Sequence, residues 1–408
     1  MKKLSILLVV VMLCSFSTMA LAKSEVSIYW AEYDGLTPEY AQALTAAFEK
    51  ANPDITLKIV STPWNVLHEK LITSLGAKQA PDLSVIGTRW LLEFMDMGVV
   101  EPIEQHLSKQ LLGNIPESIM EGKIKNVLYG LPMAIGPRIM YYRTDLMKKA
   151  PETFEEMREI AKQINKPPDV YGVGMSGAKY TELTEFAYYL YGNGGDFFAM
   201  TPDGAYGKCI VNNEAGVKAL TFMNDLVNKD KVTQPSTLQD MRDQVQDLFV
   251  AGKLGFMMSG GFTGAMLNQR GVKFGWAPAL IPHFEGKPRA PLFITDSVIM
   301  FNTSKDKAAA GKFLDFFFQD EWRLQFDKLT GFPPVTKSLG PNPQFQTPTY
   351  QAMVKSMDGA KAWPLMVEWP ECNDIIWKAI SATFLGQKDP KKALDDAAAE
   401  IDALRGQK

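Results

Sequence analysis

Residues 26–60, VSIYWAEYDGLTPEYAQALTAAFEKANPDITLKIV, contain a complete strand–helix–strand unit. Apolar and polar residues alternate over 26–30, which is the period of a β-strand. Thr37-Pro38 then supplies an N-cap followed by proline at the first helical position, and Asn52-Pro53 ends the helix. Alternation returns over 55–59. The stretch therefore predicts two strands joined by a helix, the repeating unit of an α/β fold.

The same pattern continues along the chain and predicts a largely parallel sheet with helices on its faces. A second helix, at 153–164, opens with the capping box formed by Thr153 and Glu156. No flexible linker separates the halves, so we expect two α/β domains joined by short crossings, with a cleft between them. The remaining predicted strands are 83–86, 171–175, 254–258 and 298–301, and the remaining predicted helices are 66–75, 90–97, 182–191, 214–228, 239–251 and 307–318.

The N-terminus has the features of an export signal. Lys2 and Lys3 precede an apolar run over 4–13, and Ala20-Leu21-Ala22 is a small-x-small cleavage pattern. The apolar run is too short to span a bilayer. Cys14 suggests a lipoprotein as an alternative, but the residue before it is a bulky leucine. We expect residues 1–22 to be a cleaved signal peptide and the mature protein to be soluble and periplasmic.

Net charge, chain length and cysteine content limit the classes of protein to which the chain can belong. Removing residues 1–22 takes away two of the 43 basic residues and none of the 46 acidic ones, which leaves a net charge of −5. Without a lysine–arginine run, nucleic acid and anionic membrane are not expected partners. The expected mature chain, residues 23–408, is too long for one hydrophobic core and has the length typical of two domains. Cys209 and Cys372 could form one disulfide or remain free thiols.

The residues that follow the predicted strands have the chemistry of a binding site. In open α/β sheets, ligands bind beyond the carboxyl ends of the strands. Here those ends carry aromatic rings, carboxylates, a guanidinium group and glycines. The loops are Glu32-Tyr33-Asp34, Thr62-Pro63-Trp64-Asn65, Gly87-Thr88-Arg89-Trp90 and Ser259-Gly260-Gly261-Phe262.

At this point the chain resembles a known family, the extracellular solute-binding proteins of ABC importers, in its carbohydrate-binding, maltose-binding-protein-like group (solute-binding family 1). Each matching motif is a common strand, turn or helix junction, but their order and spacing extend over the whole chain. The motifs are FEKANPDITLKI (48–59), APDLSVI (80–86), MGVVEPI (97–103), LYGLP (128–132), MYYRTDLMKKAPETFEEM (140–157), GNGGDFF (192–198), LFVAGKLGFMMSGGF (248–262) and FNTSKDKAAAGKFLDFF (301–317).

The resemblance implies the periplasmic-binding-protein fold, with two α/β lobes that close around one ligand. Carried onto this chain, the N-terminal lobe holds 23–135 plus 297–328, and the C-terminal lobe holds 138–294 plus 331–408. Three hinge crossings then fall near 134–138, 293–296 and 329–331.

Two positions depart from the family pattern and leave the substrate open. The loop after LYGLP often carries a polar ligand contact in the family, and here residues 133–136 are Met-Ala-Ile-Gly. Phe262 stands where many relatives have tryptophan.

The expected ligand-binding residues follow from the chemistry of a sugar. Aromatic rings stack on its C–H faces, and charged or amide groups bind its hydroxyls. Trp30, Trp276 and Trp322 fit strand or helix packing better than a cleft. The expected ligand-binding residues are Tyr33, Asp34, Trp64, His68, Arg89, Trp90, Arg138, Gly261, Phe262, Asp296 and Trp363.

The expected function is capture of a sugar or polyol by hinge closure and its delivery to an inner-membrane ABC permease, by a monomer without cofactor or catalytic residues. A phosphorylated polyol, another anion or a metal ion is an alternative ligand, because Arg89 and Arg138 suit phosphate and carboxylate. A secreted carbohydrate-acting enzyme is a further alternative. However, the sequence offers no G-x-S-x-G elbow and no pair of histidines at i, i+4 spacing for a zinc site.

Overall fold

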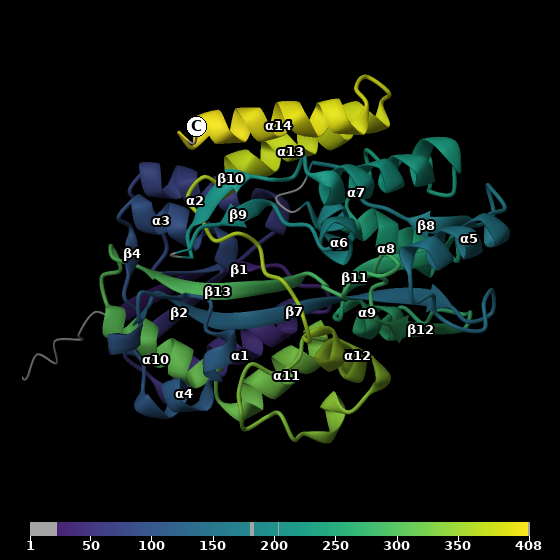
Figure 1. Ribbon diagram of the computed structural model, residues 1–408. Coiled ribbons are helices and arrows are strands. Elements are labelled where there is room, and N and C mark those ends of the chain that lie inside the picture. The colour runs from purple at the N-terminus through teal and green to yellow at the C-terminus, as the bar shows by residue number, and fades with distance from the viewer. Residues whose placement is uncertain (1–22, 180–182, 203, 407–408) are drawn as a thin grey trace, which may run out of the picture.

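The computed structural model describes residues 23–179, 183–202 and 204–406, so the predicted signal peptide lies outside the described residues. The molecule has two α/β halves, which lie left and right in Figure 1, and long strands cross the middle from one half to the other. The prediction of a two-lobed α/β architecture is confirmed.

A nine-stranded sheet runs through the described part of both halves, in the main order β2-β1-β3-β13-β7-β11-β8. β4 pairs with β13 and β12 with β7 at its margins. β1 is parallel to β2 and β3, and β8 is parallel to β11, whereas β7 and β13 run antiparallel to their neighbours. The strands of this sheet are β1 (Ser24–Ala31), β2 (Ile55–Thr62), β3 (Leu83–Gly87), β4 (Val100–Glu101), β7 (Gly130–Arg143), β8 (Tyr171–Gly174), β11 (Leu254–Gly260), β12 (Trp276–Ala279) and β13 (Phe293–Phe301).

Two small hairpins lie outside this sheet. One joins β5 (Lys123–Ile124) to β6 (Val127–Leu128), and the other joins β9 (Phe198–Met200) to β10 (Tyr206–Cys209).

Strand β7 connects the two halves. Its residues 130–137 pair with β13, and its residues 138–143 pair with β11 and β12. The change of partner falls between Pro137 and Arg138, inside the first crossing predicted from the sequence. The sequence predicted only a short apolar stretch at 140–142 here. Residues 130–141 are all buried, so the polar–apolar alternation of a half-buried strand is missing.

Helices cover both faces of the sheet (Figure 1). The predicted caps are present: Thr37 Oγ1 accepts from Tyr40 N at 3.3 Å, and Thr153 Oγ1 accepts from Glu156 N at 3.1 Å. The helices are α1 (Pro38–Ala51), α2 (Trp64–Gly76), α3 (Leu91–Asp96), α4 (Lys109–Asn114), α5 (Phe154–Ile164), α6 (Thr184–Gly192), α7 (Glu214–Asn224), α8 (Arg242–Val250), α9 (Thr263–Gln269), α10 (Lys307–Phe317), α11 (Asp320–Thr330), α12 (Pro348–Ser356), α13 (Trp369–Phe384) and α14 (Pro390–Leu404).

Two predicted helices differ locally from the structure. The helix expected at 90–97 begins with a 3-10 turn, Thr88–Trp90, and continues as α3. The helix expected at 214–228 is α7 followed by a π-helical turn, Asp225–Lys229.

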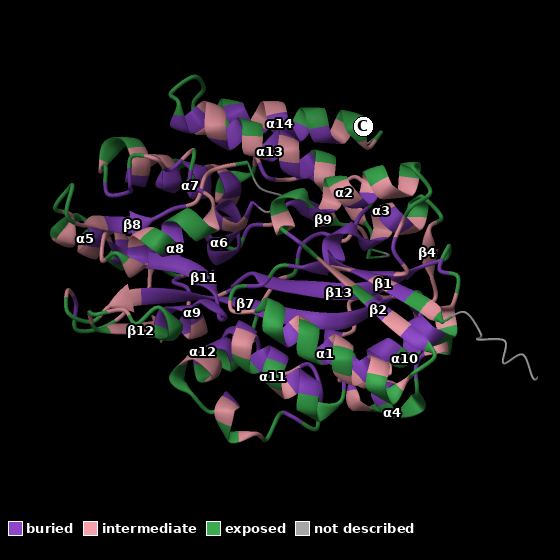
Figure 2. Ribbon diagram, turned by 180° about the vertical axis from the view of Figure 1, so that it is seen from behind, coloured by how far each residue is buried: buried purple, intermediate pink, exposed green. Residues whose placement is uncertain are grey.

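The described residues of the first half form one apolar core, called the first core here. Those of the second half form a large core, called the second core, and a smaller cluster around Tyr141. Figure 2 shows burial concentrated in the strands and the inner faces of the helices. Trp30 is buried in the first core, with its ring 4.9 Å from that of Phe317, and Trp322 lies in the same core. Trp276 packs against Tyr141 at 5.9 Å. The structural roles predicted for these three tryptophans are confirmed.

The two described cysteines are free, buried thiols. Burial raises the pKa of Cys209 to about 11 and that of Cys372 to about 12. The structure therefore holds them as packing residues of the second core rather than as a disulfide.

A buried ion pair anchors α11 to the start of β7. Arg323 and Asp327 have no exposed side-chain surface, and Arg323 Nη2 lies 2.5 Å from Asp327 Oδ1. Arg323 Nη1 donates to the carbonyl of Met133 on β7 at 2.9 Å. The pair thus joins a helix of the first half to the strand that crosses between the halves.

We expect Asp327→Ala to destabilise the protein by about 3–5 kcal/mol, because it leaves the Arg323 guanidinium buried without its carboxylate. Urea unfolding measures the loss. The double variant Arg323→Met/Asp327→Leu is the control, since removing both charges should cost less than removing one. An Asp327→Ala variant as stable as wild type would contradict this role.

Candidate functional site

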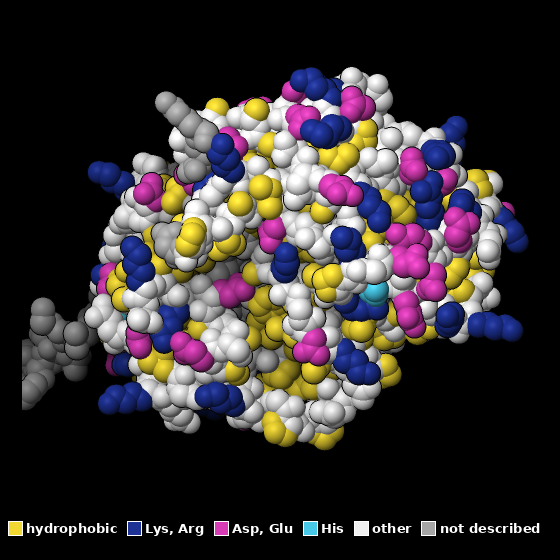
Figure 3. All heavy atoms as spheres, viewed as in Figure 1, with side chains coloured by type: hydrophobic (Ala, Val, Ile, Leu, Met, Phe, Trp, Pro, Cys, Tyr) yellow, Lys and Arg dark blue, Asp and Glu magenta, His cyan; other side chains and the backbone are white. Residues whose placement is uncertain are grey.

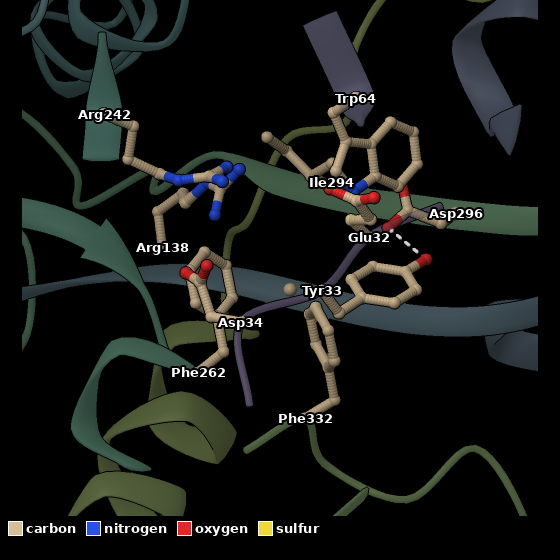
Figure 4. Close-up of a pocket in the computed structure, with 11 residues that line it drawn as sticks. Glu32, Tyr33, Asp34, Trp64, Arg138, Arg242, Phe262, Ile294, Asp296 and Phe332 are labelled. Atoms are coloured by element: carbon tan, nitrogen blue, oxygen red, sulfur yellow. Dashed lines mark hydrogen bonds between the residues drawn. The ribbon is translucent and has the colours of Figure 1, made fainter. Parts of the chain in front are cut away.

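A cavity of about 40 Å³ lies where loops from both halves meet (Figure 4). The loops after β1 and β2 supply one side, and β7 and β13 supply the back. The end of β11, the start of α8 and the segment between α11 and α12 supply the other side. The lining residues are Glu32, Tyr33, Asp34, Trp64, Gly136, Arg138, Arg242, Phe262, Ile294, Asp296 and Phe332.

A hydrogen bond between Tyr33 and Asp296 fixes the back of this cavity. Tyr33 Oη donates to Asp296 Oδ2 at 3.0 Å, and both side chains are at least nine-tenths buried. Burial, with the neighbouring Asp296 carboxylate, raises the pKa of Tyr33 well above its ordinary value. The phenol therefore stays protonated and keeps Asp296 in place as an acceptor.

Aromatic rings form the apolar part of the wall. The Tyr33 ring meets those of Trp64 and Phe332 edge-on, at 5.6 and 5.1 Å. Phe262 follows β11, on the opposite side, and its ring lies 5.3 Å from that of Phe332. Trp64 begins α2 and is only partly buried, so part of its ring remains accessible.

Two arginines lie side by side at one end of the cavity (Figure 4). Arg138 stands at the point where β7 changes partner and is 3% exposed, and Arg242 begins α8. Both guanidinium groups lie over the Phe262 ring, at 5.7 and 5.1 Å from its centroid. The exposed carboxylates of Glu32 and Asp34 lie at the mouth. The site thus combines ring faces with groups of both charges.

Three of the predicted residues lie beside this cavity rather than in it. His68 and Trp90 line a neighbouring cavity of about 370 Å³, which also involves Trp369 of α13. The Trp90 ring lies 6.0 Å from that of Trp64, so the two cavities are adjacent. His68 Nε2 is 2.7 Å from Glu93 Oε2, and Arg89 is buried over the Trp90 ring at 4.8 Å.

Two further predicted residues, Gly261 and Trp363, line neither of these two cavities. Gly261 faces α12: a Cβ there would lie 1.7 Å from Met353 Sδ, and its carbonyl accepts from Tyr141 Oη at 2.9 Å. Trp363 lies in the second core, with its ring 5.4 Å from that of Trp369. Glycine is needed at 261 for close packing, and the tryptophan fills a core.

The first cavity is also lined by residues that the sequence analysis did not select as ligand-binding. Glu32 could have been found, since it shares the strand-end loop of Tyr33 and Asp34. Arg242 and Phe332 gave no such signal, because each comes from a segment that reaches the cavity only through the tertiary fold. The others are Gly136 and Ile294.

Metal and membrane features are absent from the residues that the structure describes. Within those residues, no three His, Cys, Asp or Glu side chains gather as a metal site would need. No described helix has the length and apolar composition required to span a bilayer.

Comparisons with known proteins agree with the geometry. The family profile of bacterial extracellular solute-binding proteins matches residues 34–323. A binding protein of Brucella abortus is 33% identical over 409 aligned residues, covering 96% of this chain and 97% of its own length. The galactooligosaccharide-binding protein of Bacillus subtilis is 26% identical and covers 86% of this chain and 83% of its own.

Among solved structures, maltose-bound MalE3 of T. maritima superimposes with a TM-score of 0.84. It covers 93% of this chain and 100% of its own, at 22% sequence identity, so this likeness concerns the fold. Since the family profile spans most of the chain and the Brucella relative nearly all of it, the chain belongs to the bacterial extracellular solute-binding proteins.

Proposed function

We propose that this protein is the substrate-binding component of an ABC importer and that it captures a carbohydrate between its two halves for delivery to a membrane permease. The observation that carries the proposal is the cavity itself. It joins the rings of Tyr33, Trp64 and Phe262 with charged groups from both halves of the chain. The sugar-binding roles of the relatives from B. subtilis and T. maritima support the same ligand class.

The lining suits a sugar chemically. The partly accessible face of Trp64 can stack on the C–H face of a pyranose or furanose ring, which combines apolar burial with a preferred geometry. Asp34 and Asp296 can accept hydrogen bonds from hydroxyl groups, while Arg138 can donate to hydroxyl or ring oxygens. His68, Arg89 and Trp90 remain candidates for contact with a ligand that extends into the neighbouring cavity.

The proposed mechanism is hinge closure. A cavity of about 40 Å³ has room for only a few water molecules, so a sugar ring requires the halves to separate before it binds. In this mechanism the lobes are 23–135 plus 297–328 and 138–294 plus 331–408, and they move about the crossings in β7, in β13 and near 329–331. A ligand that touches both lobes favours the closed state, because only that state makes all the contacts.

We propose a periplasmic location after signal cleavage, and a monomeric protein without enzymatic activity. The face shown in Figure 3 supports the absence of a nucleic-acid partner, because basic and acidic side chains are interspersed over it. Conversion of the bound sugar by the purified protein would contradict the binding-protein role.

A second candidate ligand class is a phosphorylated polyol or a sugar acid. The observation that favours it is the pair formed by Arg138 and Arg242, because adjacent guanidinium groups bind phosphate and carboxylate well. The role in transport would be unchanged.

We expect a neutral saccharide to raise the unfolding midpoint in a concentration-dependent way, because a ligand that binds only the folded state stabilises it by mass action. Thermal unfolding with glucose, galactose, arabinose, maltose, maltotriose, galactobiose and sorbitol measures this. Glycerol 3-phosphate and galacturonate are the anionic comparisons. A shift with those two alone would select the anion alternative, and no shift with any compound would count against the proposed function.

We expect Trp64→Ala to weaken binding of the selected saccharide by about 1–3 kcal/mol, from lost burial and ring geometry. Asp34→Ala should cost about 1.5–3 kcal/mol if its charged acceptor binds a hydroxyl. Calorimetry measures both. Trp363→Phe is the matched control: it alters a core ring outside both cavities and should lower stability without lowering affinity. Wild-type affinity in the first two variants would place the ligand elsewhere.

A further inference from the structure

Glu185 is a buried carboxyl group at the N-terminal end of α6, and it is 6% exposed. Its Oε1 accepts two hydrogen bonds from Ser176, from the backbone N at 3.2 Å and from Oγ at 3.1 Å. Its Oε2 is buried and has no hydrogen-bond partner among the residues that the structure describes. A buried polar oxygen left in this way is costly, so it calls for an explanation.

The side chain lines a small chamber behind the site described above. The chamber has a volume of about 30 Å³, and Arg138 and Arg242 belong to its wall as well as to that of the first cavity. The two arginines therefore stand between the chamber and the Trp64–Phe262 cavity. The other lining residues are Ser176, Ala178, Thr184, Tyr188, Met241, Met258 and Ser259.

The carboxyl group is held in its neutral form. Burial raises the pKa of Glu185 to about 8, although the Ser176 hydrogen bonds and the positive charge of Arg138 act in the opposite direction. Among the described residues, the other titratable groups near it are Arg242 from α8 and, on its own helix, Tyr188 and Tyr189. Because Oε1 already accepts two hydrogen bonds, the proton belongs on Oε2. Near neutral pH, Glu185 therefore carries one O–H donor within the wall of the chamber.

We infer that Glu185 is a ligand-binding, specificity-determining residue whose Oε2–H donates to an oxygen atom of a hydroxyl or hydroxymethyl group that the bound carbohydrate inserts between Arg138 and Arg242. This inference rests on the proposed carbohydrate-binding function. A chamber of about 30 Å³ admits a group of that size but not a sugar ring. The site thus selects carbohydrates with a protruding hydroxyl group at this end.

The test uses calorimetric titration of wild-type protein and variants with the saccharide that gives the largest thermal shift in the panel above, at pH 6.5 to 9. Wild-type affinity should fall as the pH rises through about 8, because the donor is lost. Glu185→Ala should bind about tenfold more weakly or worse at pH 7, the effect of losing one buried hydrogen bond.

Glu185→Gln is the decisive variant. Its amide oxygen can accept from Ser176 and its NH₂ group can take the place of the Oε2–H donor. We expect affinity within about threefold of wild type at pH 7, since donor and acceptor are both retained, and no fall of affinity at alkaline pH. Glu121→Gln is the matched control. Glu121 is a half-buried carboxyl whose pKa is likewise raised by burial, it accepts a hydrogen bond from Thr295 Oγ1, and it lines neither cavity.

The protonation of Glu185 can also be tested without ligand, by measuring the pH dependence of the free energy of unfolding. Between about pH 4.5 and 8 the folded state keeps a proton that the unfolded state releases, so this group lowers the free energy of unfolding as the pH rises. In Glu185→Gln, the free energy of unfolding should therefore decrease less between about pH 4.5 and 8 than it does in the wild-type protein.

Three results would overturn the inference. The first is wild-type affinity in Glu185→Ala, which would make the chamber a site for internal water only. The second is a Glu185→Gln variant that keeps the alkaline loss of affinity, and the third is a folded Glu185→Gln variant that fails to bind at pH 7. Absence of wild-type binding to every saccharide would instead overturn the proposed function, and this inference with it.

Discussion

The backbone hydrogen bonds of β7 hold the molecule together. One continuous strand pairs with β13 in the first half and with β11 and β12 in the second, so the two cores share a single piece of sheet. Arg138 lies directly after the change of partner, and Asp296 lies on β13 opposite Ala134, beside a register irregularity. The covalent crossings therefore also carry charged groups of the site.

The site depends on this arrangement because its residues come from distant parts of the chain. Tyr33 and Trp64 end one set of strands, Phe262 and Arg242 belong to the other half, and β7 and β13 supply the back wall. The Tyr33–Asp296 hydrogen bond ties a strand-end loop to a crossing. A movement of one half relative to the other must consequently change the distance between the rings of Tyr33 and Trp64 and the guanidinium group of Arg242. That coupling is what a protein needs if ligand binding is to be reported to a partner as a change of shape.

Local signals predicted much of the fold. Alternation over 26–30, the caps at Thr37 and Thr153, and the strand-end rule led to β1, α1, α5 and the Tyr33–Asp34 loop. The sequence did not predict the full length of β7, because complete burial removes the alternation of polar and apolar residues. It also did not predict the packing of Gly261 against Met353 or of Trp363 in the second core, because both contacts depend on the tertiary fold. Arg242, Phe332 and Glu185 could not be found locally, because only the fold brings them to the cavities.

The length of β7 has a consequence for how this chain can vary. Side chains on a strand alternate between its faces, so removing or adding one residue within 130–137 would exchange the two faces of everything that follows. Arg138 would leave the cavity, and the hydroxyl group of Tyr141 would lose its hydrogen bonds to the carbonyls of Gly260 and Gly261. The number of residues in β7 therefore fixes how the side chains of the two cores are positioned relative to each other. Natural variants should tolerate exchanges of apolar residues along it but not insertions or deletions, even at positions that no ligand could touch.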